Sequence, residues 1–319
     1  MISQHSSRSS HISRWQFLHG AALSAGAMLA GGGVFAAGRD RENPRFAGAT
    51  GFLDGELEAK TFPGAALVVT QHGETVLERY WGTYKDWEQR DVPCEAGMVN
   101  MLYSLSKLIT STVVVMAHQD SLFEYDAPVS RYIPEFVGGG KDKVHVRHLL
   151  THSAGLGGVP LKAVDTEEKW EAAVKTLCAA SVEWEPGSRT IYHGLTGHFL
   201  AAEVVRRTSG MKSWESICRE RLFDPIGAKS LSFRKPGKDV PVALTPQSSQ
   251  LVFKPDSPEF TLNNLEIAGH PAGGAFGTSS DILKVLQLHL KRGQWHGKTL
   301  IKPGALEEMH TVQYAAEIR

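Results

Sequence analysis

A helix that must be buried sets the strongest limit on how this chain can fold. Residues 105–117 are nearly all apolar over the length of a helix, with Val113, Val114 and Val115 at the centre. A surface helix has an apolar stripe on one side only, whereas this segment is apolar on all sides. We therefore expect it to lie in the middle of a core, which a chain of 319 residues with 42% hydrophobic content is long enough to build.

A β-hairpin is predicted before this helix. Residues 65–71 and 75–81 have the composition of strands, and His72-Gly73 lies between them at the position of a turn. A polar stretch at 38–43 precedes the hairpin and is interpreted as a linker.

Three further helices are predicted after the buried one. Apolar residues recur with helical periodicity in three segments, at 167–179, at 195–208 and at 279–292. Gly210 and Gly293 are expected to end two of these helices, and Thr278 with Asp281 forms a capping box at the start of the last one. Sheet at the start and helices in the middle predict an α/β (α+β) architecture. We expect an α/β part at about 44–125 and 270–319, and a helical part at about 126–269.

Charge and cysteine content exclude several classes of protein. Lys plus Arg and Asp plus Glu both number 34, so no charge excess indicates binding to nucleic acid or to an anionic membrane surface. Cys94, Cys178 and Cys218 are widely spaced and none belongs to a C-x-x-C pair. At most one disulfide is expected, and each cysteine is interpreted as a small buried hydrophobic residue.

Residues 1–37 have the composition of a secretory signal peptide. They contain Arg8 and Arg14, no acidic residue, and an apolar run at 18–37 that ends in the small-residue pattern 34–36. Trp15 stands where a twin-arginine signal has its second arginine, so the export route stays open. We expect cleavage and a periplasmic or secreted protein without stable membrane association. An uncleaved membrane anchor is the alternative.

The pattern S-x-x-K can bring a serine hydroxyl and a lysine amine together, because residues three apart share one face of a helix. It occurs three times, at Ser104/Lys107, Ser209/Lys212 and Ser232/Lys235. Only Ser104 opens the buried helix, where backbone N–H groups could stabilise an oxyanion and burial could lower the pKa of the lysine. The other two pairs lie at a helix end and in a turn, and we interpret them as surface residues.

Five segments in the same order resemble the penicillin-binding serine hydrolases, in particular class C β-lactamases and class VIII esterases. They are 62–66 (FPGAA), 103–108 (YSLSKL), 146–156 (VRHLLTHSAGL), 184–187 (WEPG) followed by Tyr192, and 273–281 (GGAFGTSSD). The resemblance implies a β-lactamase/transpeptidase-like fold and a covalent acyl-enzyme, without a cofactor. Ser104 would be acylated, and Lys107 and Tyr192 would share the base and acid roles.

Two departures from the family pattern affect the function expected. Where the family has Tyr-x-Asn, this chain has Tyr192-His193-Gly194, which favours a small ester or other acyl substrate over a β-lactam. The family's later Lys-Thr-Gly or His-x-Gly box has no match, and 297–300 (GKTL) is interpreted as a loop. We therefore expect the last strands of the sheet to be missing, with part of the oxyanion hole.

Two alternatives remain open beside a serine hydrolase acting on a small ester or amide. His145, His148 and His152 follow H-x-x-H-x-x-x-H and could ligate zinc from one helical face. The missing box also leaves open a non-catalytic or truncated exported protein of the same fold. Oligomeric state cannot be predicted from these patterns.

Overall fold

The computed structural model describes residues 43–313 except Gln89, Pro160, Lys212 and 244–266. The predicted signal segment 1–37 lies outside the described residues. The chain divides into two compact units at Gly82/Thr83, which are described separately.

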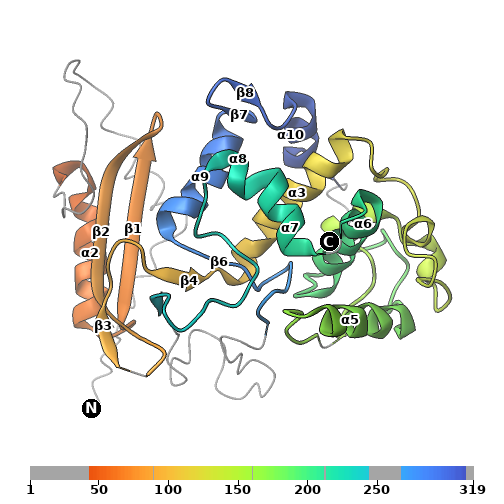
Figure 1. The fold of residues 1–319 in the computed structure, drawn as a ribbon, viewed down its shortest axis with the longest axis horizontal. Helices are drawn as coiled ribbons and strands as arrows, with labels where there is room; N and C mark the ends of the chain where they lie inside the picture. The colour runs from red at the N-terminus through yellow and green to blue at the C-terminus, as the bar shows by residue number, and fades with distance from the viewer. Residues whose placement is uncertain (1–42, 89, 160, 212, 244–266, 314–319) are drawn as a thin grey trace, which may run out of the picture. The chain divides into compact units, whose positions relative to one another are not determined.

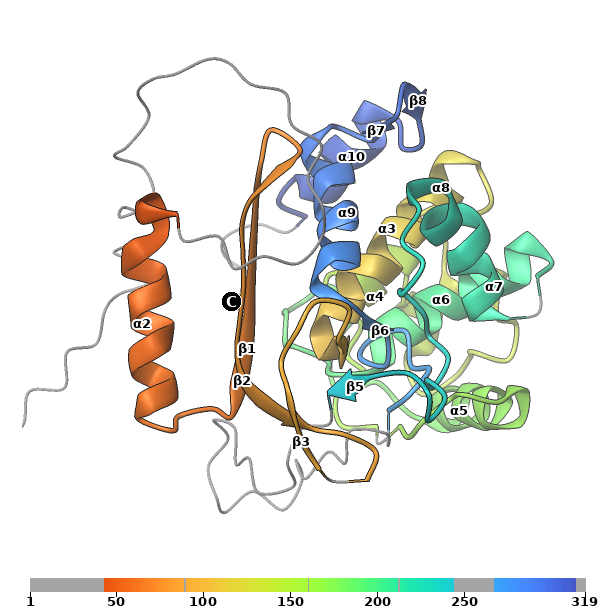
Figure 2. The ribbon, with the colours of Figure 1, turned by 60° about the vertical axis from the view of Figure 1, so that its left-hand side comes forward.

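The first unit is a hairpin with one helix along it (Figures 1 and 2). Its elements are η1 (Pro44–Phe46), α2 (Ala47–Glu58), β1 (Gly64–Gln71) and β2 (Glu74–Lys85), and β1 and β2 are antiparallel. His72 and Gly73 both have positive φ, of 53° and 89°, as a two-residue type I′ turn requires. The carboxylate of Asp54 in α2 accepts hydrogen bonds from Arg79 and Trp81 of β2. The predicted hairpin is thus confirmed.

The second unit is built around α3 (Ser106–Gln119), which Figure 1 shows among the other helices. Ile109, Val113 and Val114 of this helix are fully buried, so the prediction of a buried central helix is confirmed. Direct contacts with α3 are made by α6 (Thr196–Ser209), α7 (Trp214–Cys218) and α10 (Pro303–His310). Helix α4 (Val146–Leu150) packs against α6.

Within the described residues, the other elements of this unit are three α-helices and several short strands and turns. They are β3 (Asp91–Pro93), β4 (Val99–Met101), η2 (Tyr103–Leu105), η3 (Val129–Arg131), η4 (Lys141–Lys143), α5 (Glu167–Ala179), η5 (Arg219–Phe223), α8 (Asp224–Ile226), β5 (Val242–Ala243), β6 (Phe276–Gly277), α9 (Ser279–Leu290), β7 (Gln294–Trp295) and β8 (Lys298–Thr299).

A small three-stranded sheet leads into the central helix. Strand β4 lies between β5, to which it is parallel, and β6, to which it is antiparallel. The N–H of Leu102, which follows β4, donates to the carbonyl of Ala275, which precedes β6. The start of the helical run at η2 is therefore fixed against the segment before β6. Strand β3 pairs with the end of β2 that follows Gly82.

Helices α4 and α6 approach each other closely at a glycine. A Cβ atom on Gly197 of α6 would lie 2.2 Å from the carbonyl oxygen of Leu149 in α4, a distance that no side chain tolerates. Glycine at this position therefore allows the two backbones to pack in direct contact.

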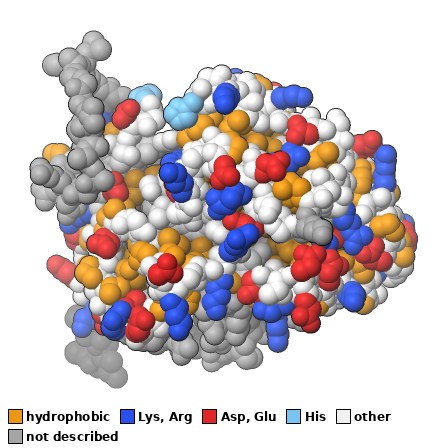
Figure 3. All heavy atoms as spheres, viewed as in Figure 1, with side chains coloured by type: hydrophobic (Ala, Val, Ile, Leu, Met, Phe, Trp, Pro, Cys, Tyr) orange, Lys and Arg blue, Asp and Glu red, His pale blue; other side chains and the backbone are white. Residues whose placement is uncertain are grey.

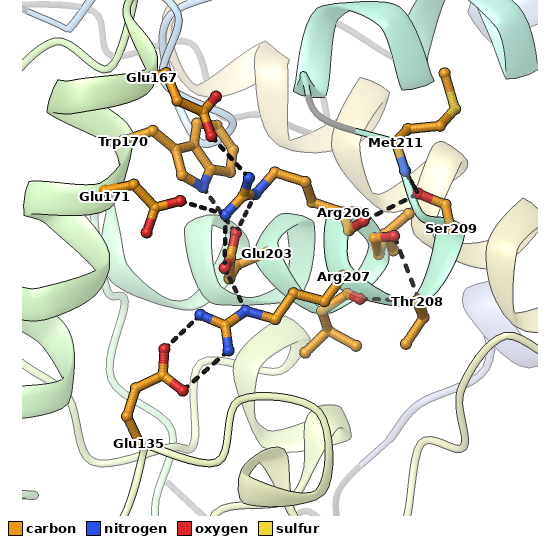
Figure 4. A network of polar contacts seen from close by, with 12 residues as sticks. Glu135, Glu167, Trp170, Glu171, Glu203, Arg206, Arg207, Thr208, Ser209 and Met211 are labelled. Carbon is orange, nitrogen blue, oxygen red and sulfur yellow. Dashed lines mark hydrogen bonds and ion pairs between the residues drawn. The ribbon is translucent and has the colours of Figure 1, made fainter.

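A buried carboxylate ties α5 to α6 (Figure 4). The side chain of Glu203 is fully buried and accepts hydrogen bonds from Arg206 and Arg207, each at 2.6 Å. It also accepts from the indole N–H of Trp170 in α5, at 2.8 Å. Arg207 continues to Glu135, so one network joins two helices and a loop. Complete pairing of this kind is what a buried charge requires.

The helices predicted at 167–179, 195–208 and 279–292 correspond to α5, α6 and α9. Gly210 caps α6 in the left-handed conformation, as predicted. The side chain of Thr278 accepts from the N–H of Asp281, which is one half of the predicted capping box, whereas the Asp281 carboxylate accepts from Ser230. The interpretation of 297–300 as a loop is wrong for Lys298 and Thr299. These residues form β8, which pairs with β7 across a tight turn. A strand of two residues is too short to leave a periodic pattern.

Cys178 and Cys218 are free thiols. Cys218 is buried in the core, as predicted, whereas Cys94 and Cys178 are only half-buried, so the interpretation as buried residues is wrong for these two. On the face shown in Figure 3, acidic and basic side chains are interspersed without a field of one sign. Within the described part of the chain, none of the helices has the length and apolar character needed to cross a membrane.

Candidate active site

Ser104 lies where the chain turns from sheet to helix. It belongs to η2, directly after β4, and η2 runs on into α3. The preceding Tyr103 has a φ of 43°, in the left-handed region that non-glycine residues seldom adopt. The side chain of Ser104 is exposed, whereas Ser106 and Lys107 are buried. The Ser104 hydroxyl can therefore be reached from solvent at the start of an otherwise buried helix.

Lys107 lies one helical turn after Ser104 and is only 8% exposed. Its amine donates to the carbonyl oxygens of Gly194 at 2.7 Å and Ala272 at 2.9 Å, and it lies 3.4 Å from the hydroxyl oxygen of Ser104. Burial lowers the pKa of Lys107, and this outweighs the opposing effect of Tyr192. In the neutral amine, two N–H groups directed at two carbonyls leave the lone pair for the Ser104 hydroxyl.

Tyr192 completes the group from a segment remote in sequence. Its phenol oxygen lies 2.7 Å from the Ser104 hydroxyl oxygen, and the Lys107 amine lies 5.0 Å from the centre of its ring. Partial burial raises the pKa of Tyr192. Hydrogen bonds with Lys107 and Ser104, together with the charge of Lys107, lower this pKa by more than burial raises it, so the net pKa is below the usual 10. Two groups with lowered pKa therefore lie against one hydroxyl, an arrangement that can exchange its proton.

The loop that presents Ala272 is held by α3 and by a buried histidine. Thr110 donates to the carbonyl of Pro271 at 2.7 Å, and Nδ1 of His270 accepts from the N–H of Ala272 at 3.0 Å. Burial, with the charge of Lys107, lowers the pKa of His270 to about 3, so its ring is neutral and able to accept this hydrogen bond. The position of one lysine acceptor thus depends on His270.

The structure brings Ser104, Lys107 and Tyr192 together but does not support the other S-x-x-K pairs. The hydroxyl of Ser232 donates to Glu215, and Lys235 is exposed. Ser209 donates to the carbonyl of Arg206, and its partner Lys212 lies outside the described residues.

The three histidines weighed as zinc ligands do not converge. His148 uses Nδ1 to accept from the backbone N–H of His145, and His152 uses Nδ1 to accept from that of His193. Among the residues that the structure describes, no group of three or more His, Cys, Asp or Glu side chains is arranged to hold a metal ion. Helix α4 ends at Leu150, before the third histidine, so the expected common helical face does not exist.

Several parts of the site were not predicted. The two carbonyls that bind Lys107 belong to Gly194 and Ala272, and a backbone acceptor leaves no trace in residue identity. His270 stands only three residues before the GGAFG segment, and that proximity was the one available signal.

The fold agrees with comparisons to known proteins. The Beta-lactamase family matches residues 49–317, and the chain belongs to that family. It is 30% identical to the esterase/beta-lactamase LipL of Mycobacterium tuberculosis over 202 residues, which cover 62% of this chain and 46% of LipL. It is 26% identical to the esterase EstB of Burkholderia gladioli over 277 residues, 74% of this chain and 67% of EstB. The chain thus spans less than half the length of LipL.

Solved structures show the same β-lactamase/transpeptidase-like fold. A family VIII carboxylesterase superposes with a TM-score of 0.65 at 26% identity, over 83% of this chain and 73% of that one. A penicillin-binding protein homologue from Caulobacter crescentus gives a TM-score of 0.70 at 24% identity, over 87% and 77% of the two chains.

Proposed function

We propose that this protein is a serine hydrolase that cleaves a small ester or amide through a covalent acyl-enzyme. Ser104 is the nucleophile, and Lys107 and Tyr192 move its proton. The observation that carries this proposal is the 2.7 Å contact between the hydroxyl oxygens of Ser104 and Tyr192, with the buried amine of Lys107 at 3.4 Å from the same serine.

In the first step the oxygen of Ser104 bonds to the substrate carbonyl carbon, and its proton passes to Lys107 or to the phenolate of Tyr192. In this mechanism the backbone N–H of Ser104, at the start of the helical run, donates to the oxyanion. Collapse of the tetrahedral intermediate breaks the bond to the leaving group, which takes the proton. Water then attacks the acyl carbon and gives a proton to Lys107 or Tyr192. When the bond from this carbon to the Ser104 oxygen breaks, the carboxylic acid is released and the proton returns to Ser104.

An ester is the favoured substrate because Gly194 carries no side chain beside Lys107. A Cβ atom added at Gly194 would meet no atom of the described residues within 4 Å. The space that the family's asparagine fills is therefore open to a substrate group. EstB is named as an esterase, which agrees with this choice, and LipL is named as an esterase/beta-lactamase. The composition of residues 1–37 supports export to the periplasm or beyond the cell.

The proposal is tested by turnover of p-nitrophenyl acetate, p-nitrophenyl butyrate and nitrocefin, together with labelling by a fluorophosphonate probe. Ser104→Ala is expected to abolish both turnover and labelling. Lys107→Met should lower kcat/KM by about 10²–10⁴, the usual contribution of a general base.

Ser232→Ala and Lys235→Met change an S-x-x-K pair that lies outside the candidate site, with Ser232 half-buried and Lys235 exposed, and should leave both measurements unchanged. Equal labelling of Ser104→Ala and the unaltered protein would exclude Ser104 as the nucleophile. A folded protein with neither turnover nor labelling would favour the non-catalytic alternative.

A further inference from the structure

His152 makes three separate contacts with the segment that carries Tyr192. Its carbonyl oxygen accepts from the N–H of Ile191 at 3.0 Å, and its Nδ1 accepts from the N–H of His193 at 3.2 Å. Its ring centre lies 4.9 Å from that of Tyr192 itself. One residue therefore holds the backbone on both sides of the tyrosine and also contacts the tyrosine ring.

The backbone of His152 is in an unusual conformation that accompanies this arrangement. Its φ is 57°, in the left-handed region, two residues after α4 ends at Leu150. A β-carbon makes that conformation costly, so it persists only where surrounding contacts hold it. Here the N–H of the following Ser153 donates to the carbonyl of His148, which fixes the turn. The turn lets the carbonyl and the imidazole of one residue both bind the 191–193 segment.

We propose that His152 is a positioning residue that holds the phenol of Tyr192 against Ser104 and Lys107. This rests on the role given to Tyr192 in the proposed function. Tyr192 is 60% exposed, so core packing does not fix its side chain and the orientation of its hydroxyl depends on how its backbone is anchored. His152 touches none of the reacting atoms and acts only through the tyrosine.

The protonation state of His152 suits this role. An Nδ1 that accepts a hydrogen bond has its ring proton on Nε2, and the ring is then neutral. Burial, followed by the charges of Lys107 and His193, lowers the pKa of His152 to about 4. His198 faces it from α6 with a ring separation of 5.4 Å. The hydrogen bond from His193 is therefore present at neutral pH.

The test compares His152→Ala with His152→Asn. Asparagine tolerates a positive φ, and its side-chain oxygen can accept in place of Nδ1. His148→Asn is the matched control, because the Nδ1 of His148 also accepts from a backbone N–H but its ring is not among the contacts of Tyr192. Two quantities are measured: kcat and KM for p-nitrophenyl butyrate, and phenol ionisation followed by absorbance near 295 nm.

His152→Ala is expected to lower kcat by about 10–100-fold with little change in KM, as misplacement of a catalytic group does. It should also raise the pKa of the Tyr192 phenol. His152→Asn should keep kcat and the pKa of the Tyr192 phenol close to those of the unaltered protein, and His148→Asn should alter neither quantity. If His152→Ala does not fold, His152→Leu, which keeps volume without an acceptor, replaces it.

A folded His152→Ala or His152→Leu protein with unchanged phenol ionisation and kcat would overturn the proposal. Equal effects of His148→Asn and His152→Ala would do so too, because they would indicate a merely structural role. Phenol ionisation does not require turnover. An inactive protein whose phenol titration still depends on His152 would contradict the proposed function and leave the positioning role intact.

Discussion

The hydroxyl oxygens of Ser104 and Tyr192 lie 2.7 Å apart although 88 positions separate the two residues in the chain. Neither residue is buried, so the contact is not a by-product of core packing. It joins a serine at the start of a central helix to a phenol whose pKa is lowered by Lys107 and Ser104.

We expect Tyr192→Phe to remove the phenol that ionises below the ordinary tyrosine pKa of about 10. The ring and its packing stay, so the protein should fold, while kcat falls by about 10²–10⁴ because a proton-transfer group is lost. Absorbance near 295 nm between pH 7 and 11 checks the first expectation, and ester turnover the second. Burial raises the pKa of Tyr84 and Tyr125, so the low-pH step cannot come from them. An unchanged titration curve would contradict the assignment.

Gly194→Asn is expected to raise nitrocefin turnover relative to p-nitrophenyl butyrate turnover. By resemblance, an asparagine amide there contacts the substrate carbonyl or the lysine, and the space around Gly194 is open among the described residues. Gly194→Ala adds a β-carbon without an amide and should leave the ratio of the two turnover rates as it is. If the ratio of nitrocefin to p-nitrophenyl butyrate turnover is the same in Gly194→Asn and the unaltered protein, residue 194 does not determine the choice between a β-lactam and an ester.

Glu203→Gln should destabilise the protein by up to about 3–5 kcal/mol, because it removes the fully buried carboxylate that two arginines share. The other partners of these arginines, Glu167, Glu171 and Glu135, are 61%, 42% and 47% exposed and compensate only in part. Arg206 and Arg207 would both lose their buried carboxylate. Glu171→Gln is the control, since its ion pair with Arg206 involves a carboxylate side chain that is 42% exposed and should contribute about 0–1 kcal/mol. Urea unfolding at pH 7.5 measures the free energy of unfolding of both variants. Equal losses of stability in the two variants would show that the burial of Glu203 does not make its ion pairs more stabilising than the exposed one.

Stability should fall as the pH is lowered from about 6.5 to 4. Burial, with the charge of His310, lowers the pKa of His289 to about 4, whereas the unfolded chain has an ordinary value near 6.5. Below pH 6.5 the unfolded chain therefore binds a proton that the folded chain does not, and protonation favours unfolding. His152 and His270 add to the same effect.

Urea midpoints at pH 7.5, 6.5, 5.5 and 4.5 measure this dependence. Nε2 of His289 pairs with Thr112 at 2.8 Å, so His289→Gln should be less stable than the unaltered protein at pH 7.5. It should nevertheless lose less stability on acidification. A slope equal to that of the unaltered protein would exclude His289 as a contributor.

The sequence predicted those features whose cause is local. The central helix was predictable because its residues are apolar on every side, and the hairpin because His72-Gly73 suits a tight turn. The burial of Glu203 was not predictable, because the groups that compensate its charge come partly from α5, far away in the chain. The role of His152 was missed for a similar reason. Its spacing from His148 indicated a helical face, whereas the helix ends before it and its ring contacts a segment forty residues later.

The two carbonyl groups that bind Lys107 also bear on how this protein could evolve. No substitution at position 194 or 272 can delete a main-chain oxygen, so the lysine keeps its acceptors as long as the path of the backbone is kept. Position 194 is exposed and, among the described residues, open around its α-carbon, so substitutions there can change the surroundings of Ser104, whereas Ala272 is fully buried and tolerates little change. The acceptors of the lysine therefore persist through changes at position 194, while that same position stays open to changes that alter which substrate fits.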